Sequence, residues 1–242
     1  MCYFKSNSQK VEDIESRYMA KFNDPTQHRP KYRENGFQFP KCAVITMKDP
    51  ASIDHIRWGL IPSWTRSRQD AFEIRIKTLN ARAESIFEKP SFKTAILSKR
   101  CLVPATGYFE WMHEGKKKTP YFISLNDAPL FSMGGIHESW IDPESGKAIE
   151  TFSIVTTEAN LLTGKIHNSK QRMPLILERA DEEKWLDNKL SHSELEKLMR
   201  PHADQNMQAW TISDKLLQNA EDGDPKIIEE WVDPAGLQGS LF

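Results

Sequence analysis

The sequence predicts a single α+β domain over residues 1–242, with a mostly antiparallel, barrel-like β core and flanking helices. Short apolar runs suited to strands recur about every ten residues, and helical stretches lie between them. A chain of 242 residues is long enough to bury a substantial core. No internal repeat, low-complexity linker or break in composition marks a second domain.

The first half of the chain alternates between helix, loop and strand. Four apolar residues recur at helical spacing near its start: Val11, Ile14, Tyr18 and Phe22. They predict an amphipathic helix over residues 10–22, and the turn-rich residues 23–42 predict a loop. Two strands are expected next, at residues 42–47 and 53–64, the second broken by Pro62. Residues 81–100 predict a helix in two pieces, with Pro90 opening the second.

The second half is richer in strand signals. Strands are expected at residues 101–112, twice within 119–141 with a joint at 126–129, at 151–160 and at 172–177. Two helices follow, a polar one over residues 177–187 and another over 191–201. The second has Ser191 as its N-cap and Pro201 beyond its end. An acidic tail completes the C-terminal part, residues 178–242.

Composition and charge exclude several classes of protein. The mean hydropathy is -0.61, no apolar run approaches the ~20 residues that span a bilayer, and no secretory signal opens the chain. We therefore expect a cytoplasmic protein without a membrane partner. The net charge of -1 argues against bulk affinity for nucleic acid. Residues 50–120 nevertheless hold 13 Lys and Arg against 7 Asp and Glu, which allows a local basic face.

Neither a metal nor a cofactor is expected. The three cysteines, Cys2, Cys42 and Cys101, are far apart and form no CxxC pair, which argues against a zinc site. Cys101 lies among apolar residues and is expected in the core. No GxxxxGK[ST], HExxH, GxSxG or GxGxxG motif occurs, so the usual NTPase, zinc-protease, hydrolase and dinucleotide-binding signatures are missing.

Cys2 follows the initiator methionine directly. If Met1 is removed, one residue carries both a free α-amine and a thiol, with pKa values near ~7.7–8.0 and ~8.5. The amine can condense with an aldehyde, and the thiol can then close a five-membered thiazolidine ring. A terminal cysteine is thus able to trap aldehydes, whereas Cys2 as an ordinary second residue would have no such role.

Asn80 and Arg82 alternate in the chain, so in an extended segment both side chains share one face. An amide beside a guanidinium suits a ligand that offers hydrogen-bonding groups and phosphates. The alternative is that Asn80 caps a helix over the following residues and Arg82 pairs with a neighbouring acid.

Glu110 and His167 are the candidate proton carriers. Glu110 lies between aromatic residues, and burial there would raise its pKa toward neutrality; an exposed strand glutamate is the alternative. His167 precedes Arg172 in a polar loop that leads into a strand, a suitable place for a titrating group and an anion contact. A plain surface histidine is the alternative.

Tryptophans provide candidate base contacts. Trp58 and Trp64 flank Gly59 and Pro62, and such side chains can stack on unpaired bases or wedge between base steps. Packing in the core is the alternative.

These features occur in a specific order. Cys2 is followed by "RWGLIPSW" (57–64), "NARAES" (80–85), "RCLVPATGYFEW" (100–111), "FSIVTTEAN" (152–160), and then His167 with "RMPLIL" (172–177). From residue 2 to residue 177 the chain resembles the SOS-response-associated peptidase (SRAP) family of abasic-site shielding proteins. The resemblance implies an α+β fold with a barrel-like core and a basic DNA channel. It also implies binding to single-stranded DNA and DNA junctions.

The resemblance further implies a role for each matching residue. Cys2 would capture the ring-opened aldehyde of an abasic site as a stable DNA–protein cross-link, and Asn80 would hold the terminal residue and the sugar. Glu110 would manage protons, and His167 would assist imine chemistry with strand scission or cross-link reversal. The DNA would be contacted by Arg82, Arg172, Trp58, Pro62, Trp64 and Trp111. Such a protein is expected to act as a monomer, in the cytoplasm and at the nucleoid.

Two departures from the family pattern stand out. The family typically begins Cys-Gly-Arg, whereas Tyr3 and Phe4 follow Cys2 here, which replaces a cation by aromatic surface. The family usually has one residue between the histidine and Arg-Met-Pro, whereas four residues separate His167 from Arg172.

Two other functions use the same residues. In an N-terminal-nucleophile peptidase or autoprotease, the Cys2 thiol would attack an amide with its own amine as base. A non-catalytic single-stranded DNA-binding module would instead depend on the basic face and the tryptophans, and Cys2→Ala would leave its binding unchanged.

Overall fold

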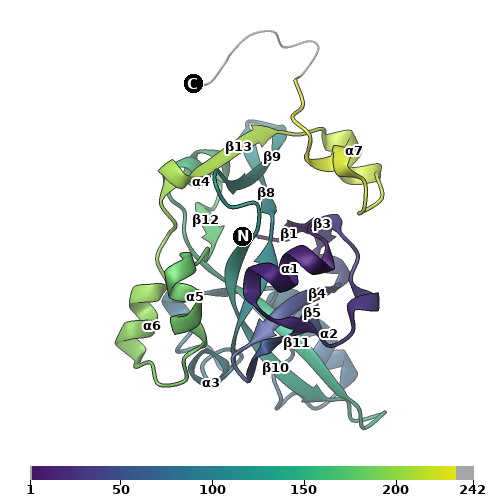
Figure 1. The fold of residues 1–242 in the computed structure, drawn as a ribbon, viewed down its shortest axis with the longest axis vertical. Helices are drawn as coiled ribbons and strands as arrows, with labels where there is room; N and C mark the ends of the chain where they lie inside the picture. Colours follow the sequence, from purple (N-terminus) through teal and green to yellow (C-terminus); the bar gives the residue numbers. More distant parts are fainter. Residues whose placement is uncertain (1, 233–242) are drawn as a thin grey trace.

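The structure is a computed structural model that describes residues 2–232, and it contains two β-sheets with helices around them (Figure 1). Five strands of the larger sheet form a closed ring: β4 (Lys41–Thr46), β5 (Asp49–Trp58), β7 (Arg100–Ala105), β10 (Phe131–Ile141) and β11 (Ala148–Glu158). Antiparallel pairing runs β5–β4–β7–β10–β11, and the parallel pairing of β11 with β5 closes the ring. The predicted α+β class and barrel-like core are confirmed.

Three short strands extend this barrel. They are β2 (Lys21–Phe22), β6 (Asn80–Arg82) and β12 (Arg172–Pro174). Both β6 and β12 pair with the last part of β11, β6 in parallel and β12 antiparallel. Thr156 of β11 is therefore opposite Arg82 on one side and opposite Pro174 on the other. This arrangement brings two segments about 90 residues apart in the chain to one end of the barrel.

The second sheet has five strands in the order β13 (Met207–Thr211), β9 (Lys117–Leu125), β8 (Gly107–Glu114), β1 (Phe4–Asn7) and β3 (Lys31–Asn35). Thr106 alone separates β7 from β8, so the chain passes directly from the barrel into this sheet. At the crossing, a Cβ on Gly107 would lie 2.1 Å from the Phe122 ring, so only glycine fits.

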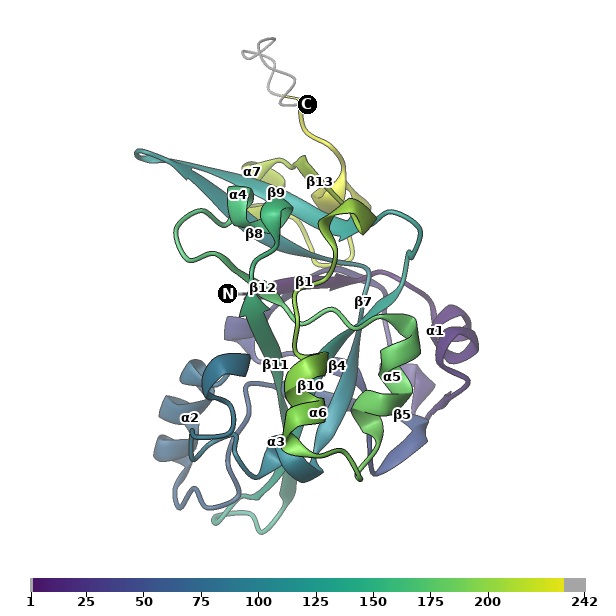
Figure 2. The same cartoon turned by 90° about the vertical axis from the view of Figure 1, so that its left-hand side faces the viewer.

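Seven helices surround the sheets within the described residues: α1 (Val11–Tyr18), α2 (Arg68–Lys77), α3 (Ala95–Ser98), α4 (Leu161–Ile166), α5 (Arg179–Leu186), α6 (His192–Leu198) and α7 (Asp214–Asn219). There are five short 3-10 turns: η1 (Pro25–Gln27), η2 (Gly36–Gln38), η3 (Ala83–Ser85), η4 (Asp204–Asn206) and η5 (Pro225–Ile228). Helices α5 and α6 lie beside the barrel, and α7 lies beside the second sheet (Figures 1 and 2). Within residues 2–232, none of the helices is long and apolar enough to cross a bilayer.

Several sequence predictions need correction. The first helix ends at Tyr18, because Met19 adopts a left-handed conformation (φ 51°) and Phe22 joins β2. The predicted loop 23–42 contains β3, and the predicted strand 101–112 is two strands that belong to different sheets. The two-piece helix over 81–100 was wrong: apart from η3 and the one-turn α3, the segment consists of turns. The serine cap is confirmed, since Ser191 forms a capping box with Glu194.

Candidate functional site

Cys2 immediately precedes β1 and is fully buried. It belongs to an apolar cluster that includes Trp58, Leu79 and Tyr108. The thiol donates to the backbone oxygen of Phe4 at 3.6 Å. Burial, reinforced by the nearby Glu110 carboxylate, raises the pKa of the Cys2 thiol to about 12. The predicted loss of Met1 concerns a residue outside the described range, so this pKa belongs to a thiol whose backbone nitrogen is still an amide.

Glu110 and His167 form a buried pair next to Cys2. Glu110 lies on β8 and His167 directly follows α4. The Nδ1 atom of His167 is 3.4 Å from Oε1 of Glu110, and the two residues are 6% and 4% exposed. Burial raises the pKa of Glu110 to about 7 and lowers the pKa of His167 to about 4. Near neutral pH the imidazole is therefore neutral, and the carboxyl can both give and take a proton.

The tautomer of His167 follows from its hydrogen bond. Nδ1 is 2.8 Å from the carbonyl oxygen of Arg172, which can only accept, so Nδ1 carries the proton. Nε2 is then left with a free lone pair that can act as a base or acceptor. The Tyr108 and Thr163 hydroxyls lie 2.8 Å apart, which ties α4 to β8 and fixes the position of His167.

Asn80 supplies a buried amide at the same end of the barrel. Strand β6 pairs Asn80 with Ile154 and is preceded by Leu79, which shares an apolar cluster with Cys2. The Asn80 side chain lies in a strand, which rules out its interpretation as a helix N-cap. Neither its oxygen nor its nitrogen has a hydrogen-bond partner within residues 2–232. Because an unpaired buried amide is costly, this one is suited to bind a ligand.

The two predicted arginines have different environments. Arg82 is exposed, and its guanidinium makes no hydrogen bond or ion pair with the described residues, so it is available to a phosphate. Arg172 is buried: its guanidinium pairs with both carboxylate oxygens of Glu84 and donates to the Thr156 carbonyl at 2.7 Å. The structure thus gives Arg172 a part in holding β12 and η3 to β11.

A family model described as SOS response associated peptidase (SRAP) matches residues 1–219. The chain belongs to the SRAP family. Abasic site processing protein YoqW of Bacillus subtilis is 34% identical over 221 residues, which cover 89% of this chain and 93% of that protein. Abasic site processing protein HMCES of Gallus gallus is 36% identical over 205 residues, covering 72% of this chain and 59% of that protein.

Solved structures agree with this SRAP assignment. A crystal structure of a Bacteroides thetaiotaomicron protein has a TM-score of 0.92 and 44% identity, and covers 96% of this chain and 100% of that chain. A Bordetella bronchiseptica protein has a TM-score of 0.75 at 21% identity, covering 88% of this chain and 100% of that chain, which speaks for the fold alone. The family membership inferred from the order of the motifs is confirmed.

The aromatic residues of the SRAP motifs separate into buried and exposed groups. Trp58 is fully buried, stacks on Phe152 at 6.0 Å between ring centroids, and donates its indole N–H to the Leu79 carbonyl. It offers no surface to a base in this conformation, and Pro62 is also buried. Trp64 is 55% exposed, whereas Trp111 is half-buried. Of the four predicted aromatic and proline contacts, Trp64 is thus the most accessible to DNA.

Some residues around the SRAP site gave no sequence signal. Thr163 and Glu84 act only through partners distant in the chain, Tyr108 and Arg172. Phe37 is 48% exposed and lies beside Tyr3, in a segment whose composition predicted only a loop. An unusual run of three aromatic residues, Tyr32, Phe37 and Phe39, was the available signal in that loop.

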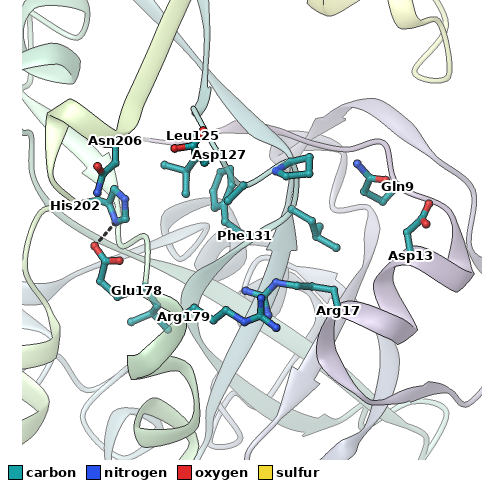
Figure 3. Close-up of a pocket in the computed structure, with 14 residues that line it drawn as sticks. Gln9, Asp13, Arg17, Leu125, Asp127, Phe131, Glu178, Arg179, His202 and Asn206 are labelled. Carbon is teal, nitrogen blue, oxygen red and sulfur yellow. Dashed lines mark ion pairs between the residues drawn. The ribbon is translucent and has the colours of Figure 1, made fainter.

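A separate cavity of about 590 Å³ lies between α1, the β9–β10 connection and the start of α5 (Figure 3). His202 and Glu178 face each other there, with Nδ1 3.2 Å from Oε1. Residues on α1 and at the start of α5 line other parts of its wall, including Arg17 and Arg179. None of the predicted site residues lines this cavity, so it is distinct from the candidate site.

Proposed function

We propose that this chain processes abasic sites by trapping the ring-opened sugar aldehyde in single-stranded DNA through Cys2, after Met1 has been removed. The product is a thiazolidine cross-link between the protein and C1′ of the sugar. The proposal draws on the names of the relatives, which are abasic site processing proteins. The observation that carries it is the buried Glu110 carboxyl, with its pKa of about 7, next to the Cys2 thiol and His167.

The reaction balances without an oxidant or a metal. The α-amine of Cys2 attacks the aldehyde carbon, and water leaves as the C=N bond of the imine forms. The thiol then adds across that bond: a C–S bond forms, and the thiol proton ends on nitrogen. The net change is the loss of one water, and the ring holds the strand to the protein.

Glu110 is suited to move the protons. A free α-amine has a pKa near ~7.7–8.0, so a carboxylate with a pKa of about 7 can accept its proton without a large free-energy cost. The α-ammonium of a processed Cys2 would also favour the thiolate, opposing the burial that raises the thiol pKa. His167, neutral and with Nε2 free of a proton, would take part in imine hydrolysis, which leads to cross-link reversal or to strand scission.

The DNA is held by groups around this centre. The unpartnered Asn80 amide would bind the sugar hydroxyls, and the exposed Arg82 would contact a flanking phosphate. Trp64 would contact the bases. We propose single-stranded DNA and junctions as the preferred partners and the monomer as the active form. This function would place the protein in the cytoplasm, at the nucleoid.

Covalent trapping is tested by mixing the protein with an oligonucleotide that contains one abasic site and separating the products under denaturing conditions. A slower-migrating adduct is expected with the processed protein, and Cys2→Ala should abolish it. Cys101→Ala is the matched control, since Cys101 is equally buried but lies on β7, and it should keep the adduct. Mass spectrometry should find the chain starting at Cys2. An adduct of undiminished yield from Cys2→Ala would refute the proposal.

A further inference from the structure

Tyr3 and Phe37 form an aromatic pair beside the candidate site. Their ring centroids are 4.8 Å apart and the planes are inclined by 37°. Tyr3 is half-buried, whereas Phe37 is 48% exposed, so the pair presents ring surface to solvent. Neither residue has a role in the trapping chemistry described above.

The position of Phe37 is fixed by its loop. Asn35 caps η2 by accepting from the Phe37 backbone N–H at 3.0 Å, and the Gly36 N–H donates to the Tyr3 carbonyl at 2.8 Å. A Cβ on Gly36 would lie 3.1 Å from that same carbonyl, so glycine allows the loop to approach this closely. Phe37 is thus held against Tyr3 before any ligand binds.

Tyr3 lies between the reacting groups and the phosphate-binding arginine. Strand β1 pairs antiparallel with β8 at Lys5 and Tyr108, and the same register extended by two residues places Tyr3 opposite Glu110. Burial and the Glu110 carboxylate raise the pKa of the Tyr3 phenol, and Arg82 opposes them, so both charges are close to this side chain. A nucleotide next to the abasic site would have to pass the Tyr3–Phe37 pair to reach Arg82.

We propose that Tyr3 and Phe37 form a stacking wall that receives the nucleobase flanking the abasic nucleotide. This inference rests on the proposed binding of abasic single-stranded DNA and adds a contact with a neighbouring base. An exposed ring beside an unpaired guanidinium is the combination that holds unpaired bases and their phosphates. Stacking does not depend on base-edge hydrogen bonds, so the wall favours purines over pyrimidines by their larger ring area and reads no sequence.

The test removes the ring and the base separately. Equilibrium binding is measured by fluorescence anisotropy with single strands that carry a tetrahydrofuran abasic analogue, which cannot form the cross-link. One strand has an adenine beside the analogue, on the 5′ or the 3′ side, and its partner has a second tetrahydrofuran there. The wild-type protein should bind the adenine strand of one polarity about 5- to 150-fold more tightly.

Phe37→Ala should lose this preference and bind the second-tetrahydrofuran strand as the wild type does. Tyr3→Phe should keep the preference, because the ring remains. Trp231→Ala, which removes a 45% exposed aromatic ring outside the site, should change neither affinity. Equal losses on both strands with Phe37→Ala, or no preference in the wild type, would overturn the wall. The covalent assay with a true abasic site reports the Cys2 chemistry independently.

Discussion

Two buried polar regions of this protein differ in how their hydrogen bonds are satisfied. Arg100 is fully buried, and its guanidinium donates to the carbonyls of Trp185, Ile96, Leu97 and Asp187. It joins β7 to α3 and α5. At the candidate site, by contrast, the Asn80 amide has no partner within residues 2–232, and Glu110 has a raised pKa.

The difference separates architecture from chemistry. A buried polar group whose hydrogen bonds are complete adds to stability and is closed to ligands, as at Arg100. A buried group with unused capacity costs stability, and the fold must supply that free energy elsewhere. The end of the barrel where β6 and β12 meet β11 is therefore the region where a ligand gains most.

The largest effect is expected for Glu110→Gln. An amide cannot exchange protons with the Cys2 amine, so the rate of adduct formation should fall by about 100- to 10,000-fold. Glu114→Gln is the matched control, since Glu114 is exposed at the end of the same strand, β8. The measurement is the single-turnover rate at pH 7 on a denaturing gel. A Glu110→Gln rate equal to that of the wild type would remove Glu110 from the mechanism.

The same substitution should stabilise the fold at alkaline pH. The pKa of Glu110 is raised from 4.5 to about 7, so between these values the unfolded chain loses a proton that the folded chain keeps. Stability therefore falls as the pH rises through this window, and the penalty is complete above it. Glu110→Gln should be more stable than the wild type by up to about 3 kcal/mol at pH 8 and nearly equal at pH 4. Urea unfolding at the two pH values measures the difference.

Arg100→Met and Asn80→Ala contrast the two regions directly. Arg100→Met leaves four backbone carbonyls without their donor and should lower the free energy of unfolding by about 3 to 5 kcal/mol. Asn80→Ala removes no protein hydrogen bond and should change stability by less than about 1 kcal/mol. It should nevertheless slow adduct formation by about 10-fold, the value of one lost hydrogen bond to the substrate. Urea melts and the gel assay on both variants decide; a large stability loss for Asn80→Ala would contradict the contrast.

The sequence predicted the fold class but not its details. Regular strand spacing indicates an α+β barrel, yet closure depends on β11 pairing in parallel with β5 and β6, which lie far away in the chain. Helix α2 was not anticipated, because its apolar residues form no continuous stripe, and Phe72 remains exposed. The segment 81–100 contains good helix formers, but tertiary packing and Pro90 leave only short turns there.

The site was predictable as a set of residues and not as an arrangement. Motif order indicated Cys2, Asn80, Glu110 and His167 together, because these residue types suit aldehyde trapping. Whether a tryptophan is buried like Trp58 or exposed like Trp64 depends on packing that a local pattern cannot report. The Glu84 partner of Arg172 is 88 residues away, so sequence alone left both arginines equally available.

The smallest effect tests the difference between the exposed and the buried arginine. Arg82 has no protein partner, so Arg82→Ala should leave stability unchanged and weaken single-strand binding several-fold at low salt. The slope of log affinity against log salt should become shallower by about 0.7, the value for one phosphate contact on a single strand. Lys147→Ala is the control, because Lys147 is exposed just before the opposite end of β11 and should keep the wild-type slope. Anisotropy titrations across a salt series measure these slopes. An unchanged slope for Arg82→Ala would mean that another cation contacts that phosphate, and the availability of Arg82 would then carry no functional meaning.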